Sequence, residues 1–458
     1  MDAAADQNHE QLIRTVAAEA YGFFRDPHVH AGGLVRDSAR PTSPCSVAAA
    51  GFALAAHVAA ETLGIASREE TLNASLEIAE AFASLPTQAD RAQASNLAGH
   101  RGLFFHFLEA DGPRRGQRAW HCELSTIDTA LLVAGLLVAA RHFSGEDERE
   151  ARLRGAVELV ADRVDWTFCL QHGGLLSHGW RPQAVNRPRK GHDRQGFIEQ
   201  GWDGYSEGLL LYVLATGSRT HPIPPESYDA WLSTYPRDWQ VVEGIEHLHC
   251  PPLFAHQFPA AMMDLREIRD AFGRERDLDY IENGRRATLA HIAYATRNPR
   301  GFPGYGPTTW GLSASNGPGI DHRRQLRRDG DSMRFYPYIE RGLPPPGGVV
   351  DDGTLAPWAA AASLPFAPEQ CVAAIQGHRD AKLCRPGWRG FMGSYNLAYV
   401  DADCPHGWAD EFDLAIEQAP IVIMAANHLH DGVWRANRKS DIVTRGLRAC
   451  GFRGGWLE

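Results

Sequence analysis

The densest group of side chains that could perform chemistry lies just before an apolar run in the middle of the chain. Three carboxylates, Glu199, Asp203 and Glu207, alternate there with Trp202 and Tyr205. The apolar residues after Glu207 predict a buried helix, so its carboxyl group would lie near the first turn of that helix. Partial desolvation there raises a carboxyl pKa and suits a general acid. Glu207 is therefore the first candidate for a catalytic acid.

The same segment has an alternative interpretation without catalysis. Asp203 and Glu207 are four residues apart, so on a helix they would share a face. Asp203 could then cap the helix while Glu207 packs in a polar pocket. The neighbouring aromatic residues favour chemistry, because aromatic rings beside clustered acids are typical of a carbohydrate cleft.

Two more carboxylates are expected near the starts of apolar helices. Asp128 lies in the first turn of one, and Glu417 leads into the apolar run 419–426. A buried carboxylate needs partners or a function, so helix capping for Asp128 and a satisfied core position for Glu417 are the alternatives. Glycoside hydrolysis needs two carboxyl functions that flank the scissile bond, and a wide gap between them gives inversion.

Further candidates for substrate contacts are polar or aromatic side chains in loops or at helix starts. They are Asp37, Trp120, Glu123, His256, Gln257, Trp310, Tyr395 and Trp408. An ion pair with Arg36 is the alternative for Asp37, and helix-end packing is the alternative for His256 and Gln257. Together with Glu199, Trp202, Asp203 and Tyr205, these residues form the predicted binding set.

These side chains must be positioned by helices, because apolar residues recur at helical spacing along most of the chain. About twelve helices are predicted, near 9–25, 44–63, 67–84, 126–143, 146–170, 203–216, 226–234, 256–272, 276–296, 354–364, 367–380 and 410–430. Some are charge-rich and others are apolar on nearly all sides, which indicates outer and buried inner helices. Strand signals are limited to short pieces near 103–107, 175–180 and 240–243. This alternation predicts an all-α fold, a single (α/α)6 toroid with a few short β-hairpins.

Long loops rich in Gly, Pro, Trp and Asp separate the predicted helices. They span 28–43, 171–202, 297–353 and 385–409. Loops of this length in a compact domain are usually functional. No stretch has the composition of a linker, so one catalytic domain is expected over residues 1–458.

The composition excludes several classes of protein. The net charge is −10, and the densest basic stretch, 323–328, has acidic neighbours, so a nucleic-acid partner is not expected. Eight cysteines have no C-x-x-C spacing, and His247 and His249 have no recognisable ligand set, so no metal or other cofactor is expected. No phosphate-binding, nucleophile-elbow or zinc-protease motif occurs.

The ends and the hydropathy of the chain bear on its location. The N-terminus is polar and acidic, and no run reaches 18 apolar residues, so no membrane span is expected. A cytoplasmic location is expected, or a periplasmic one if a leader has been removed. The expected partner is an oligosaccharide or polysaccharide, and the oligomeric state stays open.

Several of these segments resemble the bacterial glucoamylase-like domain. The similar stretches are 124–137 (LSTIDTALLVAGLL), 201–218 (GWDGYSEGLLLYVLATGS), 310–318 (WGLSASNGP), 352–357 (DGTLAP), 362–366 (ASLPF) and 416–420 (IEQAP). They also follow the order of the family, over roughly residues 20 to 435. The family includes β-1,2-glucanases, which release sophoro-oligosaccharides, and related domains of cyclic β-1,2-glucan synthases.

The resemblance implies an (α/α)6 barrel and an inverting, metal-free glycoside hydrolase of β-1,2-glucan or sophoro-oligosaccharides. It makes Glu207 the general acid, with Asp128 and Glu417 as candidates for the base. The chain departs from the family where Glu417-Gln-Ala-Pro replaces the frequent Asp-Gln-Gly-Pro, where Asn316 replaces Asp, and in a longer Arg-rich stretch, 321–342.

Three alternatives stay open. A transglycosylase or an exo-acting, disaccharide-releasing enzyme would use the same fold. A sugar epimerase would rely on paired histidines instead of Glu207. A non-catalytic glucan-binding protein would bind tightly without turnover.

Overall fold

The computed structural model describes residues 3–88, 94–182, 196–320, 335–343, 350–380, 391–401 and 404–458. Helices dominate these ranges, and no described strand is longer than four residues. The fold is therefore all-α with short β-hairpins, as the sequence predicts. No helix among the described residues is long and apolar enough to cross a membrane.

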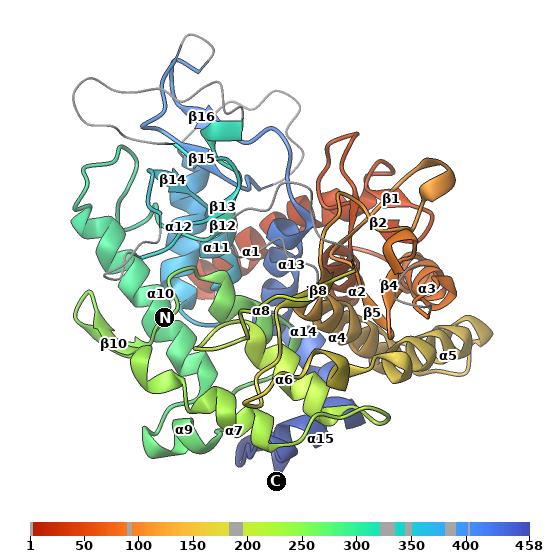
Figure 1. Ribbon diagram of the computed structural model, residues 1–458. Helices are drawn as coiled ribbons and strands as arrows, with labels where there is room; N and C mark the ends of the chain where they lie inside the picture. The colour runs from red at the N-terminus through yellow and green to blue at the C-terminus, as the bar shows by residue number, and fades with distance from the viewer. Residues whose placement is uncertain are drawn as a thin grey trace.

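The elements follow one another along the chain as shown in Figure 1. The helices are α1 (Ala3–Arg25), α2 (Val47–Thr62), α3 (Arg68–Ser84), α4 (Thr126–His142), α5 (Glu148–Arg163), α6 (Gly208–Gly217), α7 (Glu226–Leu232), α8 (Phe254–Met262), α9 (Ala271–Glu275), α10 (Tyr280–Arg297), α11 (Pro357–Ala362), α12 (Pro368–Asp380), α13 (Ala415–His430), α14 (Gly432–Asn437) and α15 (Asp441–Ala449). The strands are β1 (His30–Ala31), β2 (Leu34–Val35), β3 (Cys45–Ser46), β4 (Gly99–His100), β5 (Leu103–Phe104), β6 (Phe107–Leu108), β7 (Leu124–Ser125), β8 (Gly179–Arg181), β9 (Gly196–Phe197), β10 (Trp239–Val242), β11 (Ile245–Leu248), β12 (Ala314–Ser315), β13 (Ile339–Glu340), β14 (Thr354–Leu355), β15 (Tyr395–Asn396) and β16 (Trp408–Ala409).

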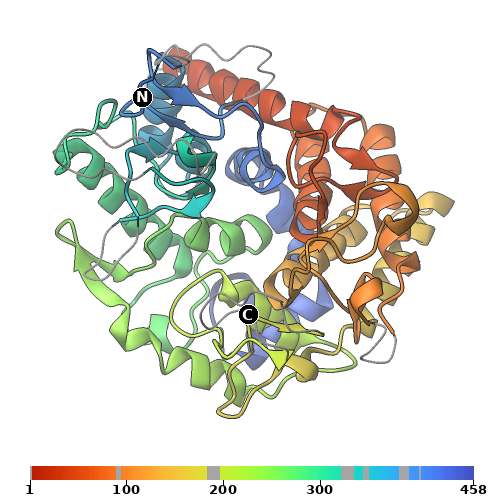
Figure 2. The same cartoon turned by 45° about the horizontal axis from the view of Figure 1, so that its top comes forward.

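Among the helices buried over nearly their whole length are α2, α4, α6, α8, α11 and α13. They pack in a closed cycle, because α2 contacts α4, α4 contacts α6, α6 contacts α8, α11 contacts α13, and α13 contacts α2. Gln257 of α8 closes the remaining gap by donating a hydrogen bond to the Ala359 carbonyl of α11 at 2.6 Å. In Figure 2 the chain runs once round the molecule from its N-terminal helices.

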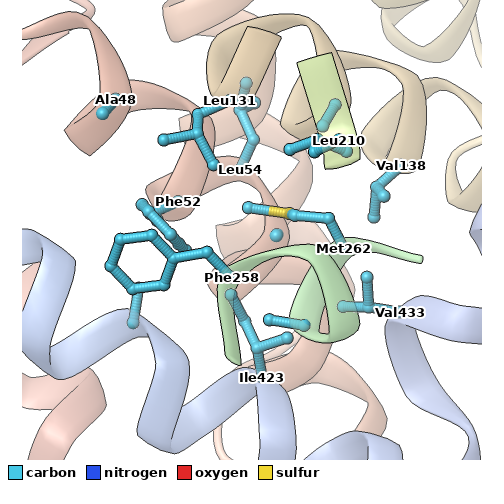
Figure 3. Packing of buried hydrophobic residues seen from close by; sticks show 14 of the residues in the cluster. Ala48, Phe52, Leu54, Leu131, Val138, Leu210, Phe258, Met262, Ile423 and Val433 are labelled. Carbon is cyan, nitrogen blue, oxygen red and sulfur yellow. The ribbon is translucent and has the colours of Figure 1, made fainter. Parts of the chain in front are cut away.

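Side chains from these buried helices share one hydrophobic core. Figure 3 shows Phe52, Leu131, Leu210, Phe258 and Ile423, from five different helices, meeting there. Burying apolar side chains of this size stabilises the fold by roughly 1.5–3 kcal/mol each. The cycle of helices therefore encloses the main core, and the ends of these helices lie outside that core.

Helices α2 and α4 approach each other most closely at two glycines. A Cβ atom on Gly51 would lie 2.2 Å from the Leu131 carbonyl oxygen, and one on Gly135 would lie 2.0 Å from the Gly51 carbonyl oxygen. Only glycine fits at such contacts between helix backbones. This pair therefore sets the distance between the two helices.

The starts of several buried helices are fixed by a short strand and a cap. Strands β3, β7 and β14 end at or just before α2, α4 and α11. Ser46 and Ser125 cap α2 and α4, because each hydroxyl accepts a hydrogen bond from a backbone N–H three residues later.

Some predicted boundaries are wrong. The helix predicted over 203–216 begins only at Gly208, because residues 201–207 form turns instead of helix. Asp203 and Glu207 therefore do not share a helical face. Helices α14 and α15 lie beyond the last predicted helix. Both helices are short, so a periodic pattern extends over few turns in each.

Candidate active site

A cavity of about 980 Å³ opens where the N-terminal ends of α2, α4, α6, α8 and α13 meet. Its wall is made of acidic, aromatic and apolar side chains. The polar and aromatic members are His106, Glu123, Ser125, Asp128, His178, Arg181, Gln200, Trp202, Asp203, Tyr205, Ser206, Glu207, Phe254, Phe258, Tyr338 and Glu340. Six residues of the predicted site are among them: Glu123, Asp128, Trp202, Asp203, Tyr205 and Glu207.

Glu207 occupies the N-cap position of α6, and its side chain does not cap the helix. Burial raises the pKa of Glu207 to about 8, and the negative charges of Glu340 and Asp128 add to this effect. A carboxyl group with this pKa is largely protonated at neutral pH. Glu207 can therefore donate a proton into the cavity.

Asp128 lies in the first turn of α4 and is almost fully buried. The Ser125 hydroxyl donates a hydrogen bond to its Oδ2, and the Nε2 of His106 lies 3.6 Å from its Oδ1. Burial raises the pKa of Asp128, although the charge of His106 and the Ser125 hydrogen bond work in the opposite direction. The structure thus places a second buried carboxyl group on the same cavity wall.

Glu123 is held as a carboxylate by two cationic side chains. It accepts a hydrogen bond from Nδ1 of His106 at 2.9 Å and lies 3.4 Å from Nη2 of Arg181. Burial alone would raise the pKa of Glu123, but the hydrogen bond and charge of His106, with Arg181, lower it to about 2. Burial would likewise lower the pKa of His106, yet Asp128 and Glu123 raise it to about 9. His106 is therefore an imidazolium between carboxylates.

The aromatic part of the wall comes from the segment before α6. Trp202 stacks on His178 with ring centroids 4.1 Å apart, and its indole N–H donates to Thr126 at 2.9 Å. Tyr205 is buried and stacks on Tyr280 at 5.8 Å. These contacts fix flat rings at the cavity beside Glu207, an arrangement suited to packing against a sugar.

Asp203 and Glu199 have different environments from Glu207. Asp203 lines the cavity at an exposed position, and its Oδ2 lies 3.0 Å from Nη1 of Arg237. Glu199 is exposed and is not part of the cavity wall, although its neighbours Ile198 and Gln200 are. Burial at the helix start therefore distinguishes Glu207 from the other two acids of the segment.

Asp37 and Glu417 lie close to the cavity without being part of its described wall. Burial raises the pKa of Asp37 to about 6, with a lowering effect of the His106 charge and a raising effect of Asp128. Glu417 is fully buried in the first turn of α13, and its Oε2 accepts a hydrogen bond from the Leu414 N–H at 3.2 Å. Its neighbour Ile416 lines the cavity.

The remaining predicted contacts lie away from the cavity wall. Gln257 donates hydrogen bonds to Ala359 and Ser363, and His256 packs beside Tyr205 with ring centroids 5.0 Å apart. For these two residues the structure favours helix packing, which was the alternative interpretation. The sequence could not show this, because a polar side chain at the start of a predicted helix can point toward substrate or pack against a neighbouring helix.

Three predicted aromatic contacts come from the glycine-rich loops. Trp310 and Tyr395 are fully buried, and His378 bridges them through the Trp310 carbonyl at 2.9 Å and the Tyr395 hydroxyl at 3.1 Å. Trp408 packs against a small apolar cluster that includes Phe335. None of the three lines the described cavity. Trp310 and Tyr395 therefore serve as core in these loops.

Trp120 lies outside the cavity wall and is 66% exposed. Its backbone has a φ of 52°, and its ring lies 5.1 Å from that of Phe107, which stacks on His106. The side chain is therefore available at the surface near the His106 side of the cavity.

Sequence reasoning missed His106, His178, Arg181, Tyr338 and Glu340, all of which line the cavity. They come from short strands or loops, where single residues carry no periodic signal. Glu340 falls in the Arg-rich stretch 321–342, of which residues 321–334 lie outside the described residues. Within the described ranges, no group of three or more His, Cys, Asp or Glu side chains could hold a metal ion.

The chain is similar to several known proteins. Residues 199–441 match the family model Glycoamylase, described as "Putative glucoamylase". An exo β-1,2-glucooligosaccharide sophorohydrolase (non-reducing end) of Parabacteroides distasonis is 23% identical over 96% of this chain. The chain spans 57% of the length of that curated relative.

Solved structures of two β-1,2-glucanases share the fold. The endo-β-1,2-glucanase of Chitinophaga pinensis, in complex with sophorotriose and glucose, is 21% identical with a TM-score of 0.76, over 98% of this chain and 99% of that one. The β-1,2-glucanase of Parabacteroides distasonis is also 21% identical, with a TM-score of 0.78, over 97% of this chain and 60% of that one.

Because the family model covers more than half of the chain, the protein belongs to the Glycoamylase family.

Proposed function

We propose that the protein is an inverting glycoside hydrolase that acts on β-1,2-glucan or sophoro-oligosaccharides. The observation that carries the proposal is the pairing of a protonated acid, Glu207, with other carboxylates and flat aromatic rings in one cavity. The similarity to the two β-1,2-glucanases and to the sophorohydrolase supports the choice of linkage.

The architecture that would carry this activity is a single (α/α)6 toroid. Its inner barrel would be the cycle of six buried helices, and α1, α3, α5, α7, α10 and α12 would form the outer layer. Each of these outer helices packs against a buried one. We assign all the described residues to this one domain.

In the proposed reaction Glu207 protonates the glycosidic oxygen while the bond from the anomeric carbon to that oxygen breaks. A water molecule attacks the anomeric carbon from the opposite face, and a carboxylate accepts its proton. The base is one of two candidates, Asp128 or Glu417. Asp128 lines the cavity and Glu417 does not, which favours Asp128 for direct contact with water.

The base can be tested with Asp128→Asn and Glu417→Gln. Loss of the base should lower kcat by about 10²–10⁴-fold. Azide, a small anion that needs no deprotonation, should restore turnover in that variant and give a glycosyl azide of inverted configuration. If a variant loses activity and azide does not restore it, the substituted residue is a positioning contact and not the base. If neither variant loses activity, the two-carboxylate mechanism is wrong.

The linkage is tested with a panel of linear β-1,2-, β-1,3- and β-1,4-glucans. The proposal expects short oligosaccharides from the β-1,2-glucan and no products from the others. Proton NMR during the first minutes should show the α-anomer of the new reducing end before mutarotation. Cleavage of another linkage in preference would refute the substrate, and an initial β-anomer would refute inversion.

An exo-acting, sophorose-releasing enzyme is a second candidate, because the curated relative is described as an exo sophorohydrolase. A time course of product lengths separates the two modes. Exo action gives sophorose alone from the start, whereas endo action gives a spread of lengths that shortens with time. Products longer than the starting chains would indicate transglycosylation.

A further inference from the structure

The aromatic rings of the cavity wall differ in how much of their surface is exposed. Trp202, Tyr205, Phe254 and Phe258 are each at most 7% exposed, whereas Tyr338 is 46% exposed. A ligand can cover only the part of a ring that solvent reaches. Among the Phe, Tyr and Trp side chains of the described wall, Tyr338 therefore offers the largest surface to a ligand.

The side chain of Tyr338 is open to the cavity and has no other function in the described fold. Within the described part of the chain, no hydrogen bond or ring stacking involves it. The surrounding protein raises the pKa of its hydroxyl well above the ordinary value, so this group keeps its proton and can both donate and accept a hydrogen bond. The ring and the hydroxyl are thus both available to a ligand.

The backbone on both sides of Tyr338 is bound to one buried guanidinium, that of Arg341. Nη2 of Arg341 donates hydrogen bonds to the carbonyls of Tyr336 and Pro337 at 3.1 and 3.2 Å. Its Nη1 donates to the carbonyl of Ile339 at 3.4 Å. The residues before and after Tyr338 are therefore held by the same group, while the Tyr338 side chain extends to the cavity.

A buried carboxylate fixes that guanidinium in turn. Nε and Nη2 of Arg341 lie 2.8 and 3.0 Å from the two carboxylate oxygens of Asp352, and neither side chain is more than 1% exposed. Asp352 also accepts a hydrogen bond from the Tyr336 N–H at 3.0 Å, and Arg341 donates one to the Ser315 carbonyl of β12 at 2.7 Å. Bidentate pairs of this kind give a fixed geometry. Because its backbone is already fixed, Tyr338 loses less conformational freedom when a ligand binds.

We propose that Tyr338 is a substrate-binding residue, whose exposed ring packs against a glucosyl unit of the glucan and whose hydroxyl forms a hydrogen bond with a hydroxyl of that unit. A glucose ring carries C–H groups on its faces and hydroxyl groups at its edge. It can therefore cover an apolar ring and pair with a phenolic hydroxyl at the same time. This inference rests on the proposed function, because the glucosyl unit belongs to the proposed substrate.

The test is the affinity for sophorotetraose, measured by titration calorimetry in the Glu207→Gln background, where cleavage is too slow to interfere. Tyr338→Ala removes the ring and the hydroxyl and should raise Kd by roughly 10–30-fold. Tyr338→Phe removes only the hydroxyl and should raise Kd by about two- to fivefold. With Glu207 intact, Tyr338→Ala should raise KM by a similar factor and keep kcat within a few-fold of wild type, because the contact exists in the ground state and the transition state alike.

The matched control is Phe197→Ala. Phe197 is 42% exposed, but its ring lies 5.0 Å from that of Phe168 and it is not part of the described cavity wall. Its Kd and KM should match those of the protein without this substitution. An unchanged Kd in Tyr338→Ala would overturn the inference. A loss of a hundredfold or more in kcat with unchanged affinity would overturn it as well, because Tyr338 would then act on the reacting atoms.

The outcomes for Tyr338 and for the proposed function can be told apart. If the wild type cleaves β-1,2-glucan but Tyr338→Ala binds sophorotetraose as tightly as its parent, only the role of Tyr338 fails. If sophorotetraose binds in a Tyr338-dependent way but the wild type cleaves no β-1,2-glucan, the proposed function fails and the binding role stands. If Glu207→Gln does not bind sophorotetraose at all, the role of Tyr338 is refuted.

Discussion

At the scale of the residue, the position of a carboxylate decides its chemistry. Asp203 and Glu207 belong to one short segment, yet Asp203 is exposed and paired with Arg237, whereas Glu207 lies at a buried helix start among like charges. The sequence placed Glu207 correctly because an apolar run follows it. The pairing of Asp203 could not be predicted, since Arg237 lies at the end of a short 3-10 helix 34 residues later in the sequence.

The raised pKa of Glu207 sets the pH dependence of activity. Because the acid must be protonated, kcat/KM should fall as the pH rises through about 8 and should decrease about tenfold per pH unit above that value. The measurement is kcat/KM on β-1,2-gluco-oligosaccharides from pH 4 to 10. A limb near the ordinary carboxyl pKa, with activity already lost at neutral pH, would show that Glu207 is not the acid.

His106 links the pH to stability as well. Its pKa is about 9 in the folded protein, above the ordinary value of 6.5. The stabilisation from its charge is therefore fully present below pH 6.5 and is lost as the pH rises through about 9. We expect the unfolding temperature of wild type to fall over this range and that of His106→Gln to fall less.

The control for this prediction is His28→Gln, at an exposed surface position. Its unfolding temperature should follow the wild-type pH dependence. If His106→Gln also follows the wild-type curve, the imidazolium does not contribute the expected charge interactions with Glu123 and Asp128.

At the scale of the element, the starts of the buried helices position the site. Asp128 and Glu207 were predicted near a helix start, and each lies there. Glu417 was predicted ahead of the apolar run 419–426 and lies in the first turn of α13, which begins later than the predicted helix. Helical periodicity is a local property, so the sequence can reveal it. Strand β13, which carries Glu340, has two residues and pairs with a strand 25 residues earlier in the chain. Such a short pairing leaves no pattern that a sequence could show.

The close contact of α2 with α4 gives a prediction for stability. Gly51→Ala would place a methyl group against the Leu131 carbonyl, so the free energy of unfolding should fall by roughly 1–3 kcal/mol. Urea denaturation measures this change. Gly155→Ala is the matched control, because Gly155 lies in α5 with no atom near its Cβ position.

The control substitution should leave stability unchanged or increase it by up to about 1 kcal/mol, since alanine favours helix more than glycine does. Equal effects of the two substitutions would mean that the helices can move apart without cost, and that the glycine pair does not set their distance.

At the scale of the whole molecule, the all-α class followed from the alternation of charged and apolar helices. The composition of the long loops was less informative. Their aromatic residues could bind substrate or form core, and Trp310 and Tyr395 are core. Whether an aromatic residue of a loop binds substrate or packs in the core depends on contacts between distant segments, such as the bridge through His378. The sequence of the loop alone does not determine this.

The convergence of the site is also a property of the whole chain. Residues from Ala48 to Ile416 line one cavity, because several buried helices present their N-terminal ends to the same place. The sequence predicted acids near the starts of separate helices. It gave no means to decide which of them face the cavity, because a turn before a helix start, as at residues 201–207, orients each side chain separately.

The most direct test of the account is the activity of Glu207→Gln on β-1,2-glucan beside that of the wild type. The substitution removes the proton donor and keeps the side-chain shape. We predict that the wild type releases short oligosaccharides and that the variant loses about 10²–10⁴-fold in kcat while it still binds the glucan. Wild-type turnover in the variant, or no cleavage of β-1,2-glucan by the wild type, would contradict the account.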